Sequence, residues 1–417
     1  MHRSRFLALI LGLTTACGSA ASSTTPIVHP TTHAPVDAHD AQAFASASNE
    51  LGLDLWEALR ARHGTQNFAV SPASISTALA MTYGGARGAT ATAMASTMHI
   101  ASSPDDTMRA AGSLVRGWND PSHTAYELAV ANRLFGAERY AFSDAYLAAT
   151  RDEMGAELQR LDFAQGDGAR STINSWVSDR THARIPELLP PGSVDGARLV
   201  LVNAVYFHGR WQQTFDPALT TDRSFHAPAG DHAVRTMARE GGAYGEDDGV
   251  QLLELPYAGG DLSMLFVLPR DRDGLAAVES QLDDATVQRW ASHVRPNEQT
   301  EVHLPRFRIE TESTSLAAPL SQLGMGPAFS DGADFGGMSA PGAVPLEISD
   351  VFHRVFVELN EEGTEAAAAT GVVMMETAAI VQPVPTPVFD ASHPFLFFLR
   401  EPSTGAILFV GRVVDPA

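Results

Sequence analysis

Lysine is absent from this 417-residue chain, so all 28 basic residues are arginines. Against 49 acidic residues they leave a formal net charge of −21 at pH 7. A chain this acidic repels phosphate backbones, which argues against nucleic acid as a partner. The same charge argues against activation by a sulfated polysaccharide, because such a ligand needs a basic face. We attribute the missing lysines to the codon bias of a GC-rich genome.

Cysteine occurs once, at Cys17, so the chain can form no internal disulfide. Basic residues near the start precede an apolar run from Phe6 to Leu13. That run is too short to span a bilayer but is typical of a signal peptide. Residues 14–17, Thr-Thr-Ala-Cys, resemble a bacterial lipobox, although the leucine lies four residues before the cysteine instead of three. We therefore predict an exported protein with a lipid on Cys17; the alternative is an ordinary signal peptide that releases a secreted protein.

Residues 18–39 are small, polar and interrupted by proline, so they cannot form a core. We predict a flexible tether between a signal segment at residues 1–17 and a single globular domain at residues 40–417. Three histidines and two aspartates near the end of the tether have no regular spacing. We interpret them as solvated residues and predict no metal site. They are His29, His33, Asp37, His39 and Asp40.

The globular part contains helix-like and strand-like patterns and no internal repeat. Apolar residues at helical spacing predict a helix from Phe44 to Leu59. A serine cap followed by proline predicts a second helix over residues 71–85, which ends at two glycines. Residues 199–207 are apolar almost throughout, which is typical of a central strand covered on both faces. Together with two predicted hairpins, this gives an α+β fold class, with hairpins at residues 252–268 and 396–410.

A strand pattern at residues 355–359, which predicts one buried face, runs into an unusual segment at residues 360–379. After Glu365 this segment is rich in alanine and nearly uncharged. In an extended conformation, alternate residues from Thr364 to Met374 share one uncharged face, while Glu365 lies on the other. The segment is therefore suited both to an exposed loop and to an inserted strand. The alternative is a short alanine-rich helix, which Thr370-Gly371 would end after about two turns.

Four motifs resemble those of the serpin family and occur in the family's order. Residues 361–370 are similar to the hinge of the reactive-centre loop in its inhibitory form, and residues 393–398 resemble the closing signature. Residues 67–81 and 201–211 match two further blocks. The resemblance implies a serpin fold, with about eight or nine helices around three β-sheets. It also implies an exposed reactive-centre loop at about residues 361–388.

The resemblance implies a mechanism as well as a fold. In serpins a protease attacks the loop and forms an acyl-enzyme; the cut loop then inserts into the main sheet and traps the protease. This chain would accordingly be a monomeric suicide-substrate inhibitor of serine proteases, not an enzyme, with no cofactor. Membrane contact would occur only through the lipid. The hinge comprises Glu361, Gly363, Thr364, Glu365, Ala366, Ala367, Ala368, Ala369 and Thr370.

The resemblance also assigns residues to the place where the main sheet opens. Trp211 and Glu361 map to the top of the sheet, where insertion begins. His353 shares the strand parity of Val355 and Val357, so its burial is also expected from the pattern alone. A hydrogen-bonded cluster is implied beneath the opening, made of Ser71, Ser74, Asn203 and His353.

Family spacing from Gly363 places the cleaved bond after Thr377 and before Ala378, with cleavage after Ala378, Ala379 or Met375 as the alternatives. No arginine occurs between Glu361 and Phe389, which argues against a trypsin-like target, because such an enzyme needs a basic residue in its pocket. The small and apolar residues here favour an elastase-like or subtilisin-like target.

Two other interpretations compete with an inhibitor of elastase-like or subtilisin-like proteases. Glu376 would suit a glutamate-specific protease. A non-inhibitory serpin, acting as an envelope binding or chaperone-like protein, is the alternative function. Such proteins usually have bulky or charged hinge residues, which this hinge lacks. An enzyme is disfavoured because the chain contains neither a Gly-x-Ser-x-Gly elbow nor a His-Glu-x-x-His motif.

Overall fold

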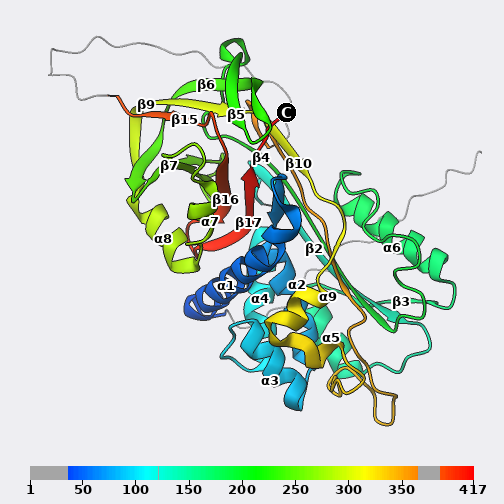
Figure 1. Ribbon diagram of the computed structural model, residues 1–417. Helices are drawn as coiled ribbons and strands as arrows, with labels where there is room; N and C mark the ends of the chain where they lie inside the picture. The colour runs from blue at the N-terminus through cyan, green and yellow to red at the C-terminus, as the bar shows by residue number, and fades with distance from the viewer. Residues whose placement is uncertain (1–35, 121, 365–385) are drawn as a thin grey trace, which may run out of the picture.

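The computed structural model describes residues 36–120, 122–364 and 386–417 (Figure 1). Several predicted features lie outside these residues: Cys17 with the signal segment, most of the tether, the hinge from Glu365 to Thr370, and the candidate bond between Thr377 and Ala378. Among the helices of the described part, none is long and apolar enough to cross a membrane.

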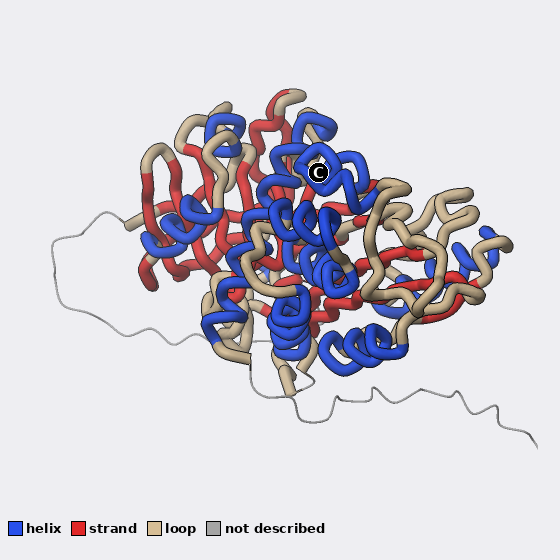
Figure 2. The backbone as a smooth tube through the Cα atoms, turned by 90° about the horizontal axis from the view of Figure 1, so that it is seen from below, coloured by secondary structure: helices blue, strands red, loops and turns tan. Residues whose placement is uncertain are grey.

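Nine α-helices lie in the described residues, in agreement with the expected eight or nine. Figure 1 shows α1–α5 and α9 in one group, with α6 apart from it, and the view from below in Figure 2 shows helices in front of the central part of the strands. The helices are α1 (Ala38–His63), α2 (Pro72–Gly85), α3 (Gly88–Thr97), α4 (Pro104–Trp118), α5 (Asp144–Met154), α6 (Gly166–Arg180), α7 (Leu275–Glu279), α8 (Asp284–His293) and α9 (Ala317–Leu320).

The first two helices follow the predicted patterns closely. In α1 the apolar stripe from Phe44 to Leu59 is buried, as predicted. The helix starts at Ala38, two residues before the predicted domain boundary, because the side chain of Asp37 accepts a hydrogen bond from the His39 amide at 3.0 Å. The second helix, α2, is capped by Ser71 and is buried along its whole length.

The described strands form three sheets. The largest runs β1 (Phe68–Val70), β17 (Ala406–Val413), β16 (Phe395–Glu401), β8 (Ser263–Pro269), β7 (Val250–Pro256), β6 (Gly230–Asp247), β9 (Arg295–Pro305) and β15 (Val388–Asp390), with β5 (Thr221–Ala227) on β6. The second runs β11 (Thr314–Ser315), β12 (Val351–His353), β4 (Leu199–Arg210), β2 (Tyr126–Ala137) and β3 (Gln159–Leu161), with β14 (Gly363–Thr364) on β4. The third pairs β10 (Phe307–Glu310) with β13 (Phe356–Leu359). The predicted hairpins are confirmed as β7–β8 and β16–β17.

The six-stranded sheet, which we call the main sheet, is split on one side of its central strand. As predicted from its apolar run, β4 is buried over Leu199–Phe207. At one end β12 pairs in parallel with β4, but the next strand in the chain, β13, pairs with β10 instead. At the other end β14 pairs antiparallel with β4, Gly363 opposite Arg210 and Thr364 opposite Gly209. We call the separation between β4 and β13 the opening.

A second, smaller apolar cluster covers the opening on the side of α6. It joins side chains of α6 to side chains from both edges of the opening. One of these, Phe356 of β13, is only 6% exposed. The strand pattern predicted one buried face here and was wrong on this point, because α6 and the loop after it cover the other face as well. The cluster includes Ile173, Val177, Ile185, Leu188, Val200, Val202, Phe352 and Phe356.

Candidate functional site

The structure brings together the four residues expected beneath the opening. The Ser71 amide donates to His353 Nε2 at 3.2 Å, and the Ser71 hydroxyl donates to the Leu408 carbonyl at 2.6 Å. The Ser74 hydroxyl donates to the side-chain oxygen of Asn203, whose amide nitrogen donates back to the Ser74 carbonyl. All four are buried, so this cluster links the start of α2 to β4 and β12.

Two members of this network were missed by the sequence reasoning. Asn132 of β2 lies directly opposite Asn203 and accepts a hydrogen bond from its amide at 2.5 Å. Asn132 in turn donates to Thr77 of α2 at 2.6 Å. Only the β2–β4 register identifies this partner, and no local motif marks it.

His353 is the one ionisable member of the cluster. Complete burial lowers its pKa to about 4. The imidazole is therefore neutral at pH 7, and its Nε2 accepts the hydrogen bond from Ser71. The other ring nitrogen, Nδ1, is shielded from water and has no hydrogen-bond partner among the described residues.

Trp211, which the resemblance maps to the top of the sheet, contacts the turn at that end of the opening. Its backbone amide donates to the Glu362 carbonyl at 2.7 Å and its indole nitrogen donates to the Asn360 carbonyl at 3.1 Å. The indole stacks on Tyr257, with ring centroids 4.4 Å apart. The residues that Trp211 contacts belong to a tight turn between β13 and β14, in which Asn360 and Gly363 exchange backbone hydrogen bonds of 2.9 and 3.2 Å.

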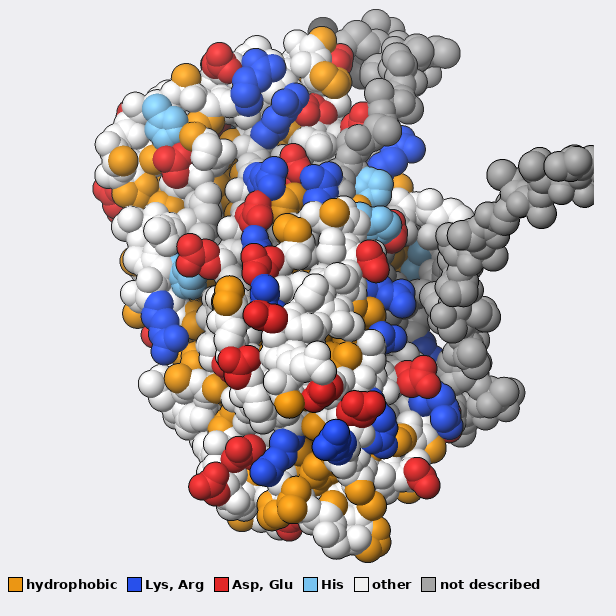
Figure 3. Space-filling view, turned by 90° about the vertical axis from the view of Figure 1, so that its right-hand side faces the viewer, with side chains coloured by type: hydrophobic (Ala, Val, Ile, Leu, Met, Phe, Trp, Pro, Cys, Tyr) orange, Lys and Arg blue, Asp and Glu red, His pale blue; other side chains and the backbone are white. Residues whose placement is uncertain are grey.

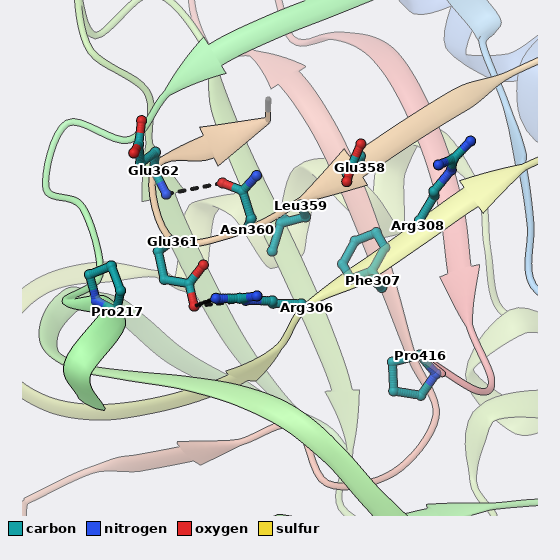
Figure 4. Close-up of a pocket in the computed structure, with 10 residues that line it drawn as sticks. All are labelled: Pro217, Arg306, Phe307, Arg308, Glu358, Leu359, Asn360, Glu361, Glu362 and Pro416. Carbon is teal, nitrogen blue, oxygen red and sulfur yellow. Dashed lines mark hydrogen bonds and ion pairs between the residues drawn. The ribbon is translucent and has the colours of Figure 1, made fainter. Parts of the chain in front are cut away.

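Glu361 anchors this turn through partners that the sequence did not identify. Glu361 is only 5% exposed. Its carboxylate accepts hydrogen bonds from Arg306 Nε at 2.7 Å and from the Thr220 hydroxyl at 2.5 Å. Burial alone would raise the pKa of Glu361, but the hydrogen bonds that its carboxylate accepts, led by those from Arg306 and Thr220, together with the charge of Arg306 lower it. Figure 4 shows this ion pair at an open pocket of about 390 Å³, which Pro217 and Pro416 also line.

Both residues of β14 are fixed by contact with β4. At Gly363, φ is +145° and an added Cβ would lie 2.0 Å from the Gly209 carbonyl oxygen, so no larger residue fits. Thr364 is 3% exposed, and its hydroxyl lies 3.0 Å from that of Tyr257. The Thr364 side chain therefore faces the core rather than α6.

A small apolar cavity lies in the opening below Thr364. Its volume is about 10 Å³, near the minimum that holds one water molecule. Its walls come from β4, β13, β14 and the strands of the large sheet behind them. The lining residues are Phe207, Met264, Phe356, Val357, Thr364, Phe397, Leu399 and Phe409.

The charged side chains around the site do not form a patch of one sign that would bind a charged ligand. Figure 3 shows arginine and acidic side chains interspersed on the face that includes α6, with neither sign gathered into one patch. Among the described residues, no group of three or more His, Cys, Asp or Glu side chains could hold a metal ion.

Comparison with known protein sequences identifies similar proteins over most of the chain. Residues 46–416 match the family described as Serpin (serine protease inhibitor). The human leukocyte elastase inhibitor is 39% identical over 393 residues, which covers 90% of this chain and 100% of that protein. The bovine protein of the same name (Bos taurus) is 39% identical over 389 residues with the same coverage. Mouse leukocyte elastase inhibitor A is 41% identical over 393 residues, again with that coverage.

Solved structures show the same fold. Human thyroxine-binding globulin in complex with thyroxine matches with a TM-score of 0.81 and 26% identity, covering 91% of this chain and all of that one. Uncleaved ovalbumin matches with a TM-score of 0.79 and 30% identity, covering 90% of this chain and all of its own. Native protease nexin-1 with heparin matches with a TM-score of 0.81 and 27% identity over 90% of this chain and 100% of that chain.

Proposed function

Because the chain belongs to the serpin family, we propose that it inhibits a serine protease as a single-use suicide substrate. The protease attacks a peptide bond in the loop between β14 and β15 and forms an acyl-enzyme with the fragment before that bond. The cut loop then enters the opening between β4 and β13. Entry carries the bound protease across the sheet before water can release it. This chain supplies the loop that the protease cleaves and the conformational strain that insertion releases, while the catalytic groups belong to the protease.

The observation that carries this proposal is the position of β14. Its two residues already pair antiparallel with β4 at the top of the opening, with the Thr364 side chain facing the core. The cavity beneath Thr364 is apolar, and the cluster of His353 and Asn203 lies farther along the same gap. Continued pairing with β4 would complete the sheet between β4 and β13.

The orientation of Thr364 separates the two faces of the inserting strand. With a period of two, Ala366 and Ala368 would face the core as Thr364 does, whereas Glu365 would face away. An arginine on the core face must bury an unpaired charge, which costs several kcal/mol. Ala366→Arg should therefore be cleaved without trapping the protease, and Glu365→Arg, its matched control, should still trap it.

The target class follows from the loop residues. The small and apolar residues around the bond proposed between Thr377 and Ala378 favour an elastase-like or subtilisin-like protease. This preference agrees with the names of the leukocyte elastase inhibitors that resemble the chain. The absence of a basic residue in the loop disfavours a trypsin-like enzyme.

The test is to mix the mature domain separately with an elastase, a subtilisin and trypsin. A product that survives detergent denaturation, at the summed mass less the C-terminal peptide, supports trapping, and mass spectrometry of that released peptide locates the cleaved bond. Cleavage by every protease tested, with no such product, overturns the proposal. The competing function is then a binding protein, a role for which the thyroxine-bound relative of the same fold is a precedent. In that case cleavage should produce no gain in thermal stability.

We also propose that residues 1–17 direct export and that Cys17 carries a lipid. The sole cysteine follows a signal-like apolar run, and the residues after it suit a tether. Mass spectrometry of the mature N-terminus in a bacterial host should find a diacylglycerol-modified cysteine. The Cys17→Ser variant should lose membrane association, and a wild-type protein found unmodified in the soluble fraction would contradict the lipid.

A further inference from the structure

Tyr257 lies where the main sheet meets the large sheet, next to the pair that Thr364 makes with β4. It follows β7 directly and is completely buried. Its amide donates to the Leu262 carbonyl at 2.9 Å in the turn between β7 and β8, and it forms an antiparallel bridge with Trp211, the residue after β4. Tyr257 is therefore attached to β4 and to the large sheet, and not to the segment that inserts.

Three neighbours fix the direction in which the Tyr257 ring points. The ring stacks on Trp211 with centroids 4.4 Å apart and meets the ring of Phe207 edge-on at 4.8 Å. The third neighbour is Gly209, where an added Cβ would lie only 2.9 Å from Tyr257 Cδ1. Gly209 is also the residue of β4 that lies opposite Thr364. Because Gly209 has no side chain, the tyrosine ring has room at the very place where the hinge pairs with β4.

The hydroxyl at the end of this ring meets the hydroxyl of the hinge. The two oxygens of Tyr257 and Thr364 lie 3.0 Å apart, and among the described residues neither hydroxyl has another hydrogen-bond partner. Thr364 is only 3% exposed. Burial raises the pKa of Tyr257, so its hydroxyl stays protonated at neutral pH and can donate as well as accept. A buried hydroxyl without a partner is costly, so each of these two groups favours the presence of the other.

We propose that Tyr257 is a positioning residue for loop insertion: its hydroxyl holds the Thr364 side chain on the core face and so fixes the register in which the hinge joins β4. This inference rests on the proposed inhibitory function and deepens it. Tyr257 acts through the hinge and does not touch the protease.

A single hydrogen bond matters here because the ladder between β14 and β4 consists of two residue pairs. A slip of one residue would put Glu365 in the place of Thr364 and turn its charge toward the core. The bond to Tyr257 favours the register with Thr364 in this place. A hydrogen bond of ordinary strength changes the ratio of paired to unpaired hinge about two- to tenfold.

Two conservative substitutions separate positioning from packing. Tyr257→Phe keeps the ring and its contacts but removes the hydroxyl, and Thr364→Val keeps the shape of the side chain but removes the other hydroxyl. Each single variant leaves one buried hydroxyl without its partner, whereas the double variant leaves none. The double variant should therefore behave more like the wild type than either single variant does. If Tyr257 contributed only packing, removing its hydroxyl would have no effect on the hinge.

The contact is tested first without any protease, by hydrogen exchange of residues 360–364 in the uncleaved protein, corrected for intrinsic rates. Each single variant should lower the protection of this segment about two- to tenfold, and the double variant should recover it. The matched control is Tyr146→Phe, at another buried tyrosine, whose hydroxyl donates to the Met81 carbonyl at 3.0 Å; it should leave the hinge unchanged. Unchanged protection in Tyr257→Phe overturns the proposal, and so do losses of the single variants that simply add in the double variant.

The consequence is then tested with the target protease, by measuring the ratio of inhibitor cleaved without trapping to inhibitor in the trapped complex. An unpaired hinge must pair again before it inserts, while hydrolysis of the acyl-enzyme continues. The ratio should therefore rise up to about tenfold in Tyr257→Phe and in Thr364→Val, and return toward the wild-type value in the double variant. Tyr146→Phe should keep the wild-type ratio. Equal ratios in wild type and Tyr257→Phe overturn the proposal while the inhibitory function stands. If the wild type traps no protease, the inhibitory function fails, and hydrogen exchange still decides whether Tyr257 holds the hinge.

Discussion

The neutral His353 beneath the opening predicts a specific loss of stability in acid. Its pKa is lowered to about 4 in the folded protein, against 6.5 for a free histidine. Between these two values the unfolded chain binds a proton that the folded protein does not, so the free energy of unfolding falls as the pH decreases from about 6.5 to about 4. At 1.36 kcal/mol per pKa unit, this one residue should cost about 3 kcal/mol over that window.

The perturbation that isolates this contribution is His353→Gln. Glutamine retains an acceptor for the Ser71 amide but does not titrate, so its stability lacks this component of the pH dependence. At pH 7 the variant should be the less stable protein, because it loses the fit of the imidazole. The difference in free energy of unfolding, wild type minus variant, should fall by about 3 kcal/mol between pH 7 and pH 4.

Urea unfolding at fixed pH values, followed by circular dichroism, measures this difference for both proteins. Other buried histidines, such as His393, also have a lowered pKa, but they are common to both proteins and cancel in the subtraction. A difference that stays constant from pH 7 to pH 4 would refute the reasoning. It would mean that His353 titrates alike in the folded and unfolded states, and that it is not held neutral by burial.

Three further substitutions test other parts of the structure. Gly363→Ala places a Cβ 2.0 Å from a carbonyl oxygen of β4; it should prevent β14 pairing and lower the fraction of protease trapped, while Gly117→Ala, with open space around it, should not. Asn132→Ala removes hydrogen bonds within the buried cluster and should cost about 1–3 kcal/mol in urea unfolding; a neutral result would exclude Asn132 from the network. Arg412 and Glu279 form a buried ion pair, with Arg412 Nη1 3.0 Å from Glu279 Oε1 and each side chain 5% exposed. Arg412→Ala leaves Glu279 as a buried unpaired charge and should cost about 3–5 kcal/mol, whereas a loss below 1 kcal/mol would mean that water reaches the carboxylate.

Elements with a strong local pattern could be predicted from the sequence. The apolar stripe of α1, the Ser71-Pro72 start of α2 and the hairpins β7–β8 and β16–β17 depend on residues close together in the chain. Their positions agree with the predictions to within a few residues. The burial of His353 also followed from strand parity alone.

Partners brought together by the fold could not be predicted in this way. Arg306 and Thr220 reach Glu361 from segments 55 and 141 residues away in the chain. No spacing rule connects them, because their approach depends on how β10 and the segment before β5 pass the top of the main sheet. Phe356 illustrates the same limit: the alternation around it indicated an exposed face, but burial on that face depends on α6, far away in the sequence.

The hinge combines both kinds of information. The sequence alone shows two alternating sets of residues and favours the uncharged set, which begins at Thr364, for the core-facing side. The buried side chain of Thr364 agrees with this, and the pairing of Gly363 with Arg210, which the sequence could not supply, sets the register. Extending that register along β4 would place Thr370 of the inserted loop opposite Asn203, because each step forward on the loop is one step back on the antiparallel strand. On the proposed mechanism, the hydrogen-bonded cluster beneath the opening therefore lies where the last residue of the small-residue hinge arrives, and the larger residues after it would continue toward the end of β4.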